Sequence, residues 1–184
     1  MPVRASMIVC GASGIGKTCM IRRLAEGEFS SPTAKTVGVD FGVLRIGPTL
    51  RLDVYDLSGA DSFLEARIEF YRDAVIILFV FDMRSSFASE SAELEKWFTE
   101  SSHYGLPAHA RRFIVGTHCD DEDEDDNGSR RRGSNMEELI KKMTLWASVR
   151  HAIFFQVGAR NGFGVSEALD LLAKTAADAL CIIR

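Results

Sequence analysis

Apolar and polar residues alternate along the chain, first with the period of a strand and then with the period of a helix. Short apolar or alternating runs predict six strands, over residues 6–10, 41–46, 50–55, 75–81, 113–116 and 153–157. Apolar residues at helical spacing predict helices over residues 19–27, through 92–98, from 134 through 146 and over 165–176. The pattern predicts an α/β fold with a six-stranded, mostly parallel sheet and helices on both faces. Its ligand site belongs at the carboxyl ends of the strands.

The strands before and after Gly47-Pro48-Thr49 form the exception to the parallel pattern. This link is too short for a parallel crossover, so it predicts one antiparallel hairpin.

Length, net charge and cysteine content exclude only a few classes of protein. A length of 184 residues suits one domain with a full core. The formal net charge of −4 is too small to indicate a nucleic-acid partner. No apolar run is long enough to span a bilayer, and the N-terminus leads almost directly into a strand, so no signal peptide is expected. The four cysteines, at 10, 19, 119 and 181, lack metal-ligand or disulfide-framework spacing, which favours a reducing, cytoplasmic location.

A glycine-rich loop follows the first predicted strand. Gly11-Ala12-Ser13-Gly14-Ile15-Gly16-Lys17-Thr18 fits the pattern G-x-x-x-x-G-K-[ST], between the strand and the helix that the motif requires. An ordinary glycine turn with a surface lysine is the alternative, and the flanking elements favour the phosphate loop. Its backbone N–H groups would form an anion nest, Lys17 would reach the β and γ phosphates, and Thr18 would ligate Mg²⁺. The phosphate-binding residues of the loop are then Ser13, Gly14, Ile15, Gly16, Lys17 and Thr18.

Two further positions extend this site. Asp56-Leu57-Ser58-Gly59 ends the third strand, where a carboxylate can hold Mg²⁺ and the Gly59 N–H can read a γ-phosphate. Thr36 stands just before the second strand. A D-x-x-G motif has little specificity alone, but here it follows a phosphate loop, Thr36 and a hairpin, and it becomes specific.

With these motifs the chain resembles the Ras superfamily of small GTPases, and most closely the Rab branch. Residues 11–18, 36–41 and 70–72 are similar to Rab motifs, and the resemblance covers nearly the whole chain. It implies a P-loop NTPase fold in a single small-GTPase domain, residues 1–184, with GTP or GDP as ligand and Mg²⁺ as cofactor. Thr18, Thr36 and Asp56 would hold the metal, and Thr36 and Gly59 the γ-phosphate. Phe29 matches the family's aromatic residue that packs against guanine.

The base-reading motifs depart from the family pattern. Thr117-His118-Cys119-Asp120 replaces Asn-Lys-x-Asp, and Asp120 keeps the carboxylate that accepts from guanine. His118 lacks the alkyl stem that lysine lays along the base. Gly158-Ala159-Arg160 replaces Ser-Ala-Lys, and the Ala159 N–H would face the guanine carbonyl. The resemblance implies guanine binding that is weaker than usual, while the alternative is that these loops no longer hold a nucleotide. The implied guanine-binding residues are Phe29, Thr117, His118, Asp120, Ala159 and Arg160.

No catalytic residue is intact at the usual position. Ala60 stands where the family has the glutamine that orients the attacking water, and a methyl group cannot do this. Thr33 stands where some relatives carry an arginine. We therefore expect very slow hydrolysis, unless an activator brings its own glutamine and arginine.

Three aromatic residues, Phe41, Tyr55 and Phe70, fall where Rab proteins carry their effector-binding surface. They would bind effector proteins or a multi-subunit complex, or simply close the sheet surface.

A charged insertion, residues 120–133, combines an acidic run with Arg130-Arg131-Arg132, and such blocks are normally solvated and disordered. Alternatively, Arg131-Arg132-Gly133-Ser134 resembles the target of a basophilic kinase, which would phosphorylate Ser134. Ser134 and Glu137 also form a capping box that predicts the start of a helix. The last four residues, from Cys181, superficially read C-a-a-X, but arginine is an atypical last residue, so a cysteine at a helix end is favoured and no stable membrane anchor is expected.

Two functions follow from the resemblance. The first is a Rab-like switch with slow hydrolysis in vesicle or ciliary trafficking, cytoplasmic or associated with cilia or endomembranes. The alternative is a GTP-locked or nucleotide-weak subunit, a structural binding module in a larger complex such as intraflagellar transport. Either a monomer or a subunit of a hetero-complex fits.

Overall fold

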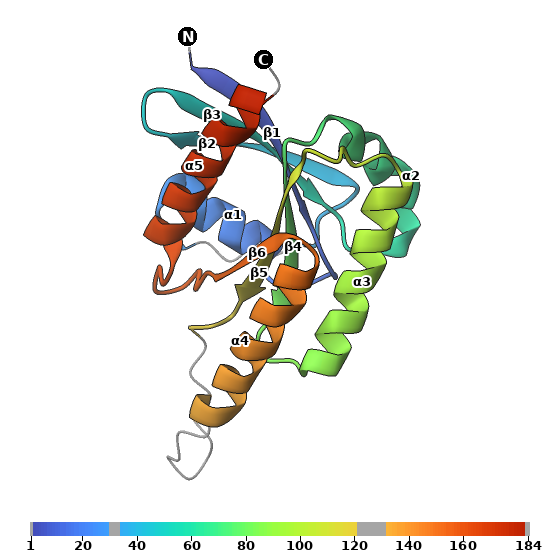
Figure 1. Cartoon of the computed structure of the whole chain (residues 1–184), viewed down its shortest axis with the longest axis vertical. Coiled ribbons are helices and arrows are strands. Elements are labelled where there is room, and N and C mark those ends of the chain that lie inside the picture. Colours follow the sequence, from blue (N-terminus) through green and yellow to red (C-terminus); the bar gives the residue numbers. More distant parts are fainter. Residues whose placement is uncertain (1, 30–33, 121–131, 183–184) are drawn as a thin grey trace.

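The computed structural model describes the backbone of residues 2–29, 34–120 and 132–182, and the side chains of these ranges except 132–135 and 180–182. One six-stranded sheet lies between two layers of helices (Figure 1). The strands are β1 (Val3–Cys10), β2 (Val39–Ile46), β3 (Leu50–Leu57), β4 (Ile76–Asp82), β5 (Arg111–Thr117) and β6 (Ala152–Gln156). The α-helices are α1 (Lys17–Glu26), α2 (Leu64–Arg67), α3 (Phe87–His103), α4 (Arg132–Val149) and α5 (Val165–Ile182). Two 3₁₀ segments, Asp61–Phe63 and Ile68–Asp73, flank α2.

The strand order is β2-β3-β1-β4-β5-β6. β2 and β3 are antiparallel, with Phe41 opposite Tyr55, and the other neighbouring strands are parallel. Gly47 in the connecting turn has a φ of 61°, a left-handed conformation that favours glycine. The predicted fold class and the predicted hairpin are confirmed.

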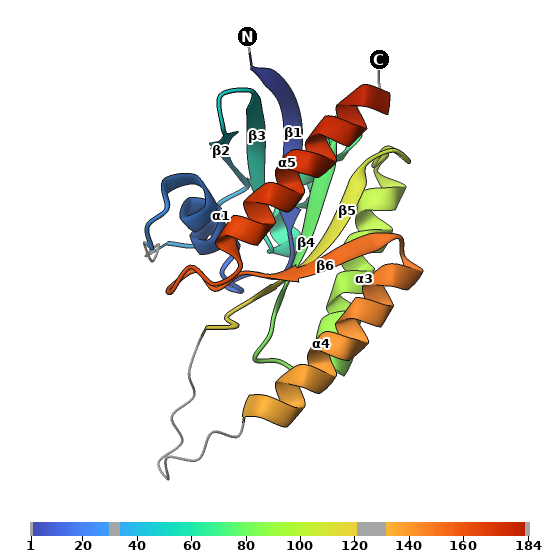
Figure 2. The same cartoon turned by 60° about the vertical axis from the view of Figure 1, so that its left-hand side comes forward.

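The core has two parts because both faces of the sheet are covered (Figure 2). Met20 and Leu24 of α1 and Leu172 of α5 pack on one face, whereas Trp97 of α3 and Met143 of α4 pack on the other. All seven residues of β4 are buried, as expected of a central parallel strand. This packing fixes the carboxyl ends of β1, β3, β4 and β5, where the predicted site lies.

Helix ends agree with the sequence at α1 and differ at α4. Gly27 ends α1 in a left-handed conformation, and its N–H donates to the Arg23 carbonyl. The predicted capping box is wrong, because α4 begins at Arg132 and Ser134 lies inside its first turn. Arginine has a high helix propensity, which suits the earlier start.

The predicted insertion consequently loses Arg132 and Gly133 to α4. Its residues 121–131 lie outside the described residues, as do the side chains of Ser134 and Cys181. The ideas about phosphorylation and lipidation therefore stay predictions. Over the described ranges, no helix is both long enough and apolar enough to cross a membrane.

Candidate nucleotide-binding site

The phosphate loop connects β1 to α1, and its backbone depends on glycine. Gly14 and Gly16 have φ values of 81° and 87°, in the left-handed region. Lys17, the first residue of α1, is buried, and its Nζ donates to the carbonyls of Gly11 (2.9 Å) and Ala12 (2.7 Å). Burial lowers the pKa of this amine, and the charge of Asp56 opposes the shift. The ammonium group is thus held at the mouth of the loop by weak carbonyl partners that a phosphate can replace.

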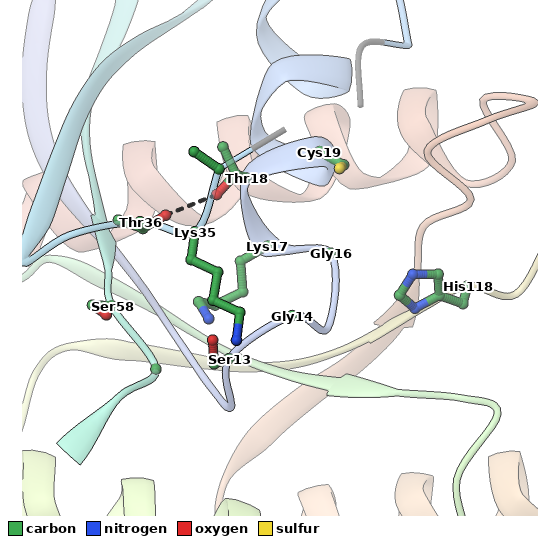
Figure 3. A pocket seen from close by; sticks show the side chains of 12 residues that line it. Ser13, Gly14, Gly16, Lys17, Thr18, Cys19, Lys35, Thr36, Ser58 and His118 are labelled. Atoms are coloured by element: carbon green, nitrogen blue, oxygen red, sulfur yellow. Dashed lines mark hydrogen bonds between the residues drawn. The ribbon is translucent and has the colours of Figure 1, made fainter. Parts of the chain in front are cut away.

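Thr18, Thr36 and Asp56 meet beside this loop, although they come from three different segments. The Thr18 hydroxyl donates to Asp56 Oδ2. The hydroxyl oxygens of Thr18 and Thr36 are 3.2 Å apart (Figure 3). The Thr36 hydroxyl lies 3.5 Å from the same carboxylate oxygen. The three residues predicted to hold a metal are therefore brought together.

Asp56 supplies the test of whether this cluster suits Mg²⁺. Its Oδ1 is buried and makes no hydrogen bond with any described residue. Burial raises the pKa of Asp56 above its ordinary value, and hydrogen bonding by Thr18 opposes the rise. A buried carboxylate oxygen without a partner, next to two hydroxyls, is the oxygen ligand set that Mg²⁺ prefers, so the residues fit the ion. No group of three or more His, Cys, Asp or Glu elsewhere in the described ranges offers another such site.

Gly59 places the second switch segment directly against the phosphate loop. A Cβ added at Gly59 would lie 2.3 Å from the Ser13 nitrogen, closer than any side chain tolerates. Gly59 and the loop border one cavity of about 300 Å³. Twelve residues line this cavity: Ser13, Gly14, Gly16, Lys17, Thr18, Cys19, Ala34, Lys35, Thr36, Ser58, Gly59 and His118. Ile15 does not line the cavity, because its side chain is buried in the core.

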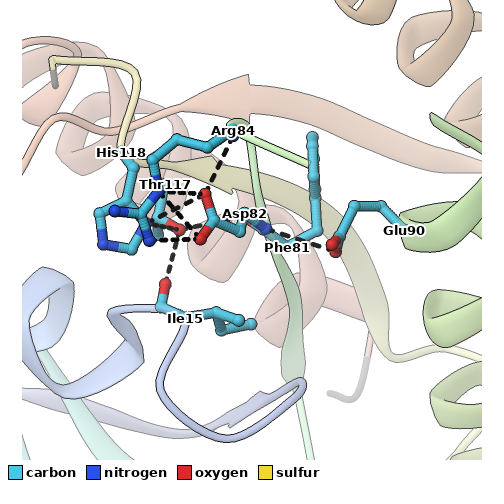
Figure 4. A network of polar contacts seen from close by, with 7 residues as sticks. All are labelled: Ile15, Phe81, Asp82, Arg84, Glu90, Thr117 and His118. Carbon is cyan, nitrogen blue, oxygen red and sulfur yellow. Dashed lines mark hydrogen bonds and ion pairs between the residues drawn. The ribbon is translucent and has the colours of Figure 1, made fainter. Parts of the chain in front are cut away.

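The base-reading residues fall into two groups. Thr117 is buried and shares its hydroxyl between the carbonyls of Ile15 (2.6 Å) and Phe81 (3.0 Å), so it ties β5 to the phosphate loop (Figure 4). His118 lines the cavity, and its Nδ1 lies 3.3 Å from Asp82 Oδ1. Burial raises the pKa of Asp82, but hydrogen bonds from Arg84 outweigh this and hold it below its ordinary value. Asp82 thus stays ionised and fixes the His118 ring at the cavity wall.

Asp120 lies apart from this group and joins the two base-reading loops. Its Oδ2 accepts from the backbone N–H groups of Arg160 (2.8 Å) and Asn161 (3.0 Å). A Cβ at Gly158 would come within 2.6 Å of the Asp120 carboxyl carbon, so the glycine that replaces the family's serine allows the close approach. Asp120 Oδ1 makes no hydrogen bond with the described residues, which leaves it open to a base edge.

The remaining guanine candidates are less closely gathered. Phe29 is 41% exposed, and neither Phe29 nor Ala159 nor Arg160 lines the cavity. The structure therefore places Thr18 and Thr36 in the cavity of the phosphate loop, with Asp56 buried beside them. The base-reading residues are divided, since His118 lines this cavity and Asp120 contacts the Arg160 backbone outside it.

Ala60 has no polar side-chain atom, and its backbone is tied down. Its N–H donates to Ser58 Oγ (3.4 Å), and its carbonyl accepts from Arg67 (2.8 Å). Thr33, the position of an arginine in some relatives, lies outside the described residues.

Arg67 is a residue that the sequence did not reveal. Its guanidinium is buried, donates from NH1 to the carbonyls of Ser58 (3.1 Å) and Ala60 (2.8 Å), and pairs at 2.7 and 2.6 Å with both carboxylate oxygens of Glu100 on α3. The guanidinium also lies 4.5 Å from the centre of the Trp97 ring, and Tyr71 donates to Glu100 (2.7 Å). We call Arg67 and Glu100 the switch clamp, since they attach both neighbours of Gly59 to α3.

The three aromatic residues of the predicted effector surface are also brought together. The ring centres of Phe41 and Tyr55 are 5.5 Å apart, and those of Tyr55 and Phe70 are 4.9 Å apart. Phe41 is 54% exposed, so the trio presents aromatic surface to solvent beside the hairpin.

Comparisons with known proteins agree with this geometry. The model of the Ras family matches residues 6–178. Ras-related protein Rab-13 of Canis lupus familiaris is 30% identical over 172 residues, 91% of this chain and 77% of that protein. Ras-related protein SEC4 of Candida albicans is 33% identical over 120 residues, 63% of this chain and 55% of that protein. DnaJ homolog subfamily C member 27 of Danio rerio is 28% identical over 178 residues, 90% of this chain and 58% of that protein. This chain therefore belongs to the Ras family of small GTPases, on its Rab-like branch.

Proposed function

We propose that this chain binds guanine nucleotide with Mg²⁺ and acts as a Rab-like switch in vesicle or ciliary trafficking, with very slow GTP hydrolysis. The observation that carries the proposal is the meeting of Thr18, Thr36 and Asp56 beside the phosphate loop, with Asp56 Oδ1 unpartnered among the described residues. Bound Mg²⁺ would neutralise phosphate charge there. The proposed role in trafficking is what membership of the Rab-like branch implies.

Each residue then has a physical task in the bound state. The loop N–H groups hold the inner phosphates, and Lys17 reaches the β and γ phosphates. Thr36 and Gly59 sense the terminal phosphate, since one lies at the metal cluster and the other against Ser13. Asp120 Oδ1 accepts from the guanine edge, which favours guanine over adenine.

Ala60 limits the chemical step. Water attacking the terminal phosphate must be oriented, and the methyl group of Ala60 offers neither donor nor acceptor. Single-turnover hydrolysis of bound GTP should therefore be faster in Ala60→Gln than in the wild type, by about tenfold or more. The matched control is Ala66→Gln, on α2 away from the cavity, which should leave the rate unchanged. An Ala60→Gln rate equal to that of the wild type would show that the missing glutamine is not what limits turnover.

A second candidate function is favoured by the switch clamp. Arg67 holds the carbonyls on both sides of Gly59, and Arg67 itself is buried against α3. A second switch held in this way resists rearrangement when the terminal phosphate leaves. This supports a GTP-locked or nucleotide-weak subunit that serves as a structural module in a larger complex such as intraflagellar transport.

Partner binding is assigned to Phe41, Tyr55 and Phe70 in both cases. A partly exposed aromatic cluster next to switch segments suits an effector or a complex subunit, because aromatic residues contribute strongly to interface affinity.

A further inference from the structure

Lys35 is a second cation at the phosphate end of the cavity. It lines the same cavity as Lys17 and Ser13 but comes from the opposite wall, directly before Thr36. Figure 3 shows the side chains of Lys17 and Lys35 both pointing toward the end of the loop that carries Ser13. The two amino groups therefore approach the position of bound phosphates from two sides.

The charge of Lys35 is not used within the described chain. It makes no hydrogen bond or ion pair with any residue that the structure describes, and its side chain is exposed. Asp56, the carboxylate of the metal cluster, does not pair with Lys35, since its Oδ2 is engaged by Thr18 and Thr36 and its Oδ1 is buried. A lysine that served only as a solvated surface group could point away from the cavity. Because Lys35 points into it, we infer an anionic ligand as its partner.

The position of Lys35 indicates which phosphate it meets. The loop N–H groups lie on the α1 side, where a phosphate loop holds the inner phosphates, and Lys17 reaches from this side to the β and γ phosphates. Lys35 adjoins Thr36, and Thr36 and Gly59 define the terminal-phosphate end. A diphosphate leaves this end empty, whereas a triphosphate places about two negative charges there.

We propose that Lys35 is a second cationic ligand of the terminal phosphate and makes this chain select GTP over GDP. The inference rests on the proposed function, because it requires a guanine nucleotide in the cavity. It adds to that function a residue that sets the nucleotide preference and that lies outside the phosphate-loop motif.

The test compares affinities for two nucleotides in the full chain. Dissociation constants for guanosine 5′-(β,γ-imido)triphosphate and GDP are measured with Mg²⁺ in wild type, Lys35→Ala and the control Lys174→Ala, an exposed lysine of α5. We expect Lys35→Ala to bind the triphosphate about tenfold more weakly, since one charge-assisted contact is lost at a partly solvated site, and to bind GDP as the wild type does. Lys35→Arg should keep most of the preference, and Lys174→Ala should change neither constant.

The outcomes separate the two claims. If the wild type binds both nucleotides and Lys35→Ala keeps their ratio, the role of Lys35 is overturned and the proposed function stands. If the wild type binds neither, the proposed function fails and the inference fails with it. Should Lys35→Ala not fold, Lys35→Gln gives the same comparison with a side chain of similar length.

Discussion

At the scale of single residues, burial at the phosphate and metal site destabilises the charged forms of Lys17 and Asp56. Burial shifts the pKa of Lys17 downward and that of Asp56 upward, so each shift favours the neutral form. Because the folded-state pKa of Asp56 lies above its ordinary 3.8, ionising it on raising the pH through that interval destabilises the fold. A ligand of opposite charge would stabilise the charged form of each group: phosphate for Lys17 and Mg²⁺ for Asp56.

Gly59 provides the residue-scale prediction. Gly59→Ala puts a methyl group 2.3 Å from the Ser13 backbone nitrogen, so the second switch must move away from the phosphate loop. We expect a loss of about 1–3 kcal/mol in the free energy of unfolding, measured by urea titration, and weaker triphosphate binding. Gly42→Ala is the control, because a Cβ at Gly42 meets open space in β2. Equal stability of the two variants would contradict the close approach of Gly59 to the loop.

At the scale of elements, the switch clamp joins α2 to α3. Arg67 and Glu100 form a bidentate pair, and the guanidinium faces Trp97. The pair is sheltered, with 2% of the Arg67 side chain and 15% of the Glu100 side chain exposed, so solvent screens it little. The segment from Ser58 to Arg67 therefore depends on α3 for its conformation.

Arg67→Ala tests this dependence. It removes the charged partner of Glu100, which keeps only the Tyr71 hydroxyl as a donor, and it removes the guanidinium from the Ser58 and Ala60 carbonyls, so we expect about 3 kcal/mol lower stability toward urea. Amide hydrogen exchange over residues 58–67 should also become faster. Arg72→Ala, at an exposed arginine five positions later, should change neither quantity. The clamp has no role if the two variants exchange alike in this segment.

At the scale of the whole molecule, the sequence predicted what depends on neighbours along the chain. The loop from Gly11 to Thr18 carries its strand and helix on either side, and the hairpin follows from a three-residue link, so both were predictable. The switch clamp was not, because Arg67 and Glu100 are far apart in sequence and meet only through packing.

Two other features of the site show the same limit. Lys35 stands beside Thr36 in the sequence, but only the fold places it in the cavity with Lys17. The family resemblance implies guanine binding by Thr117, and the structure adds that its hydroxyl donates to the Ile15 carbonyl of the phosphate loop. Local patterns thus identified the motifs, and tertiary contacts decided which side chains complete them.

The most direct measurement is the identity of the nucleotide carried by the purified full chain. The protein is denatured and the released nucleotide is identified by ion-exchange chromatography, with Thr18→Ala as a variant that loses the metal-side hydroxyl. We predict guanine nucleotide at close to one equivalent, with GTP surviving purification because Ala60 cannot orient water, and a reduced amount from Thr18→Ala. GDP that exchanges for added GTP would instead indicate a cycling switch. No guanine nucleotide in the wild type, with none taken up on incubation with GTP and Mg²⁺, would contradict the account.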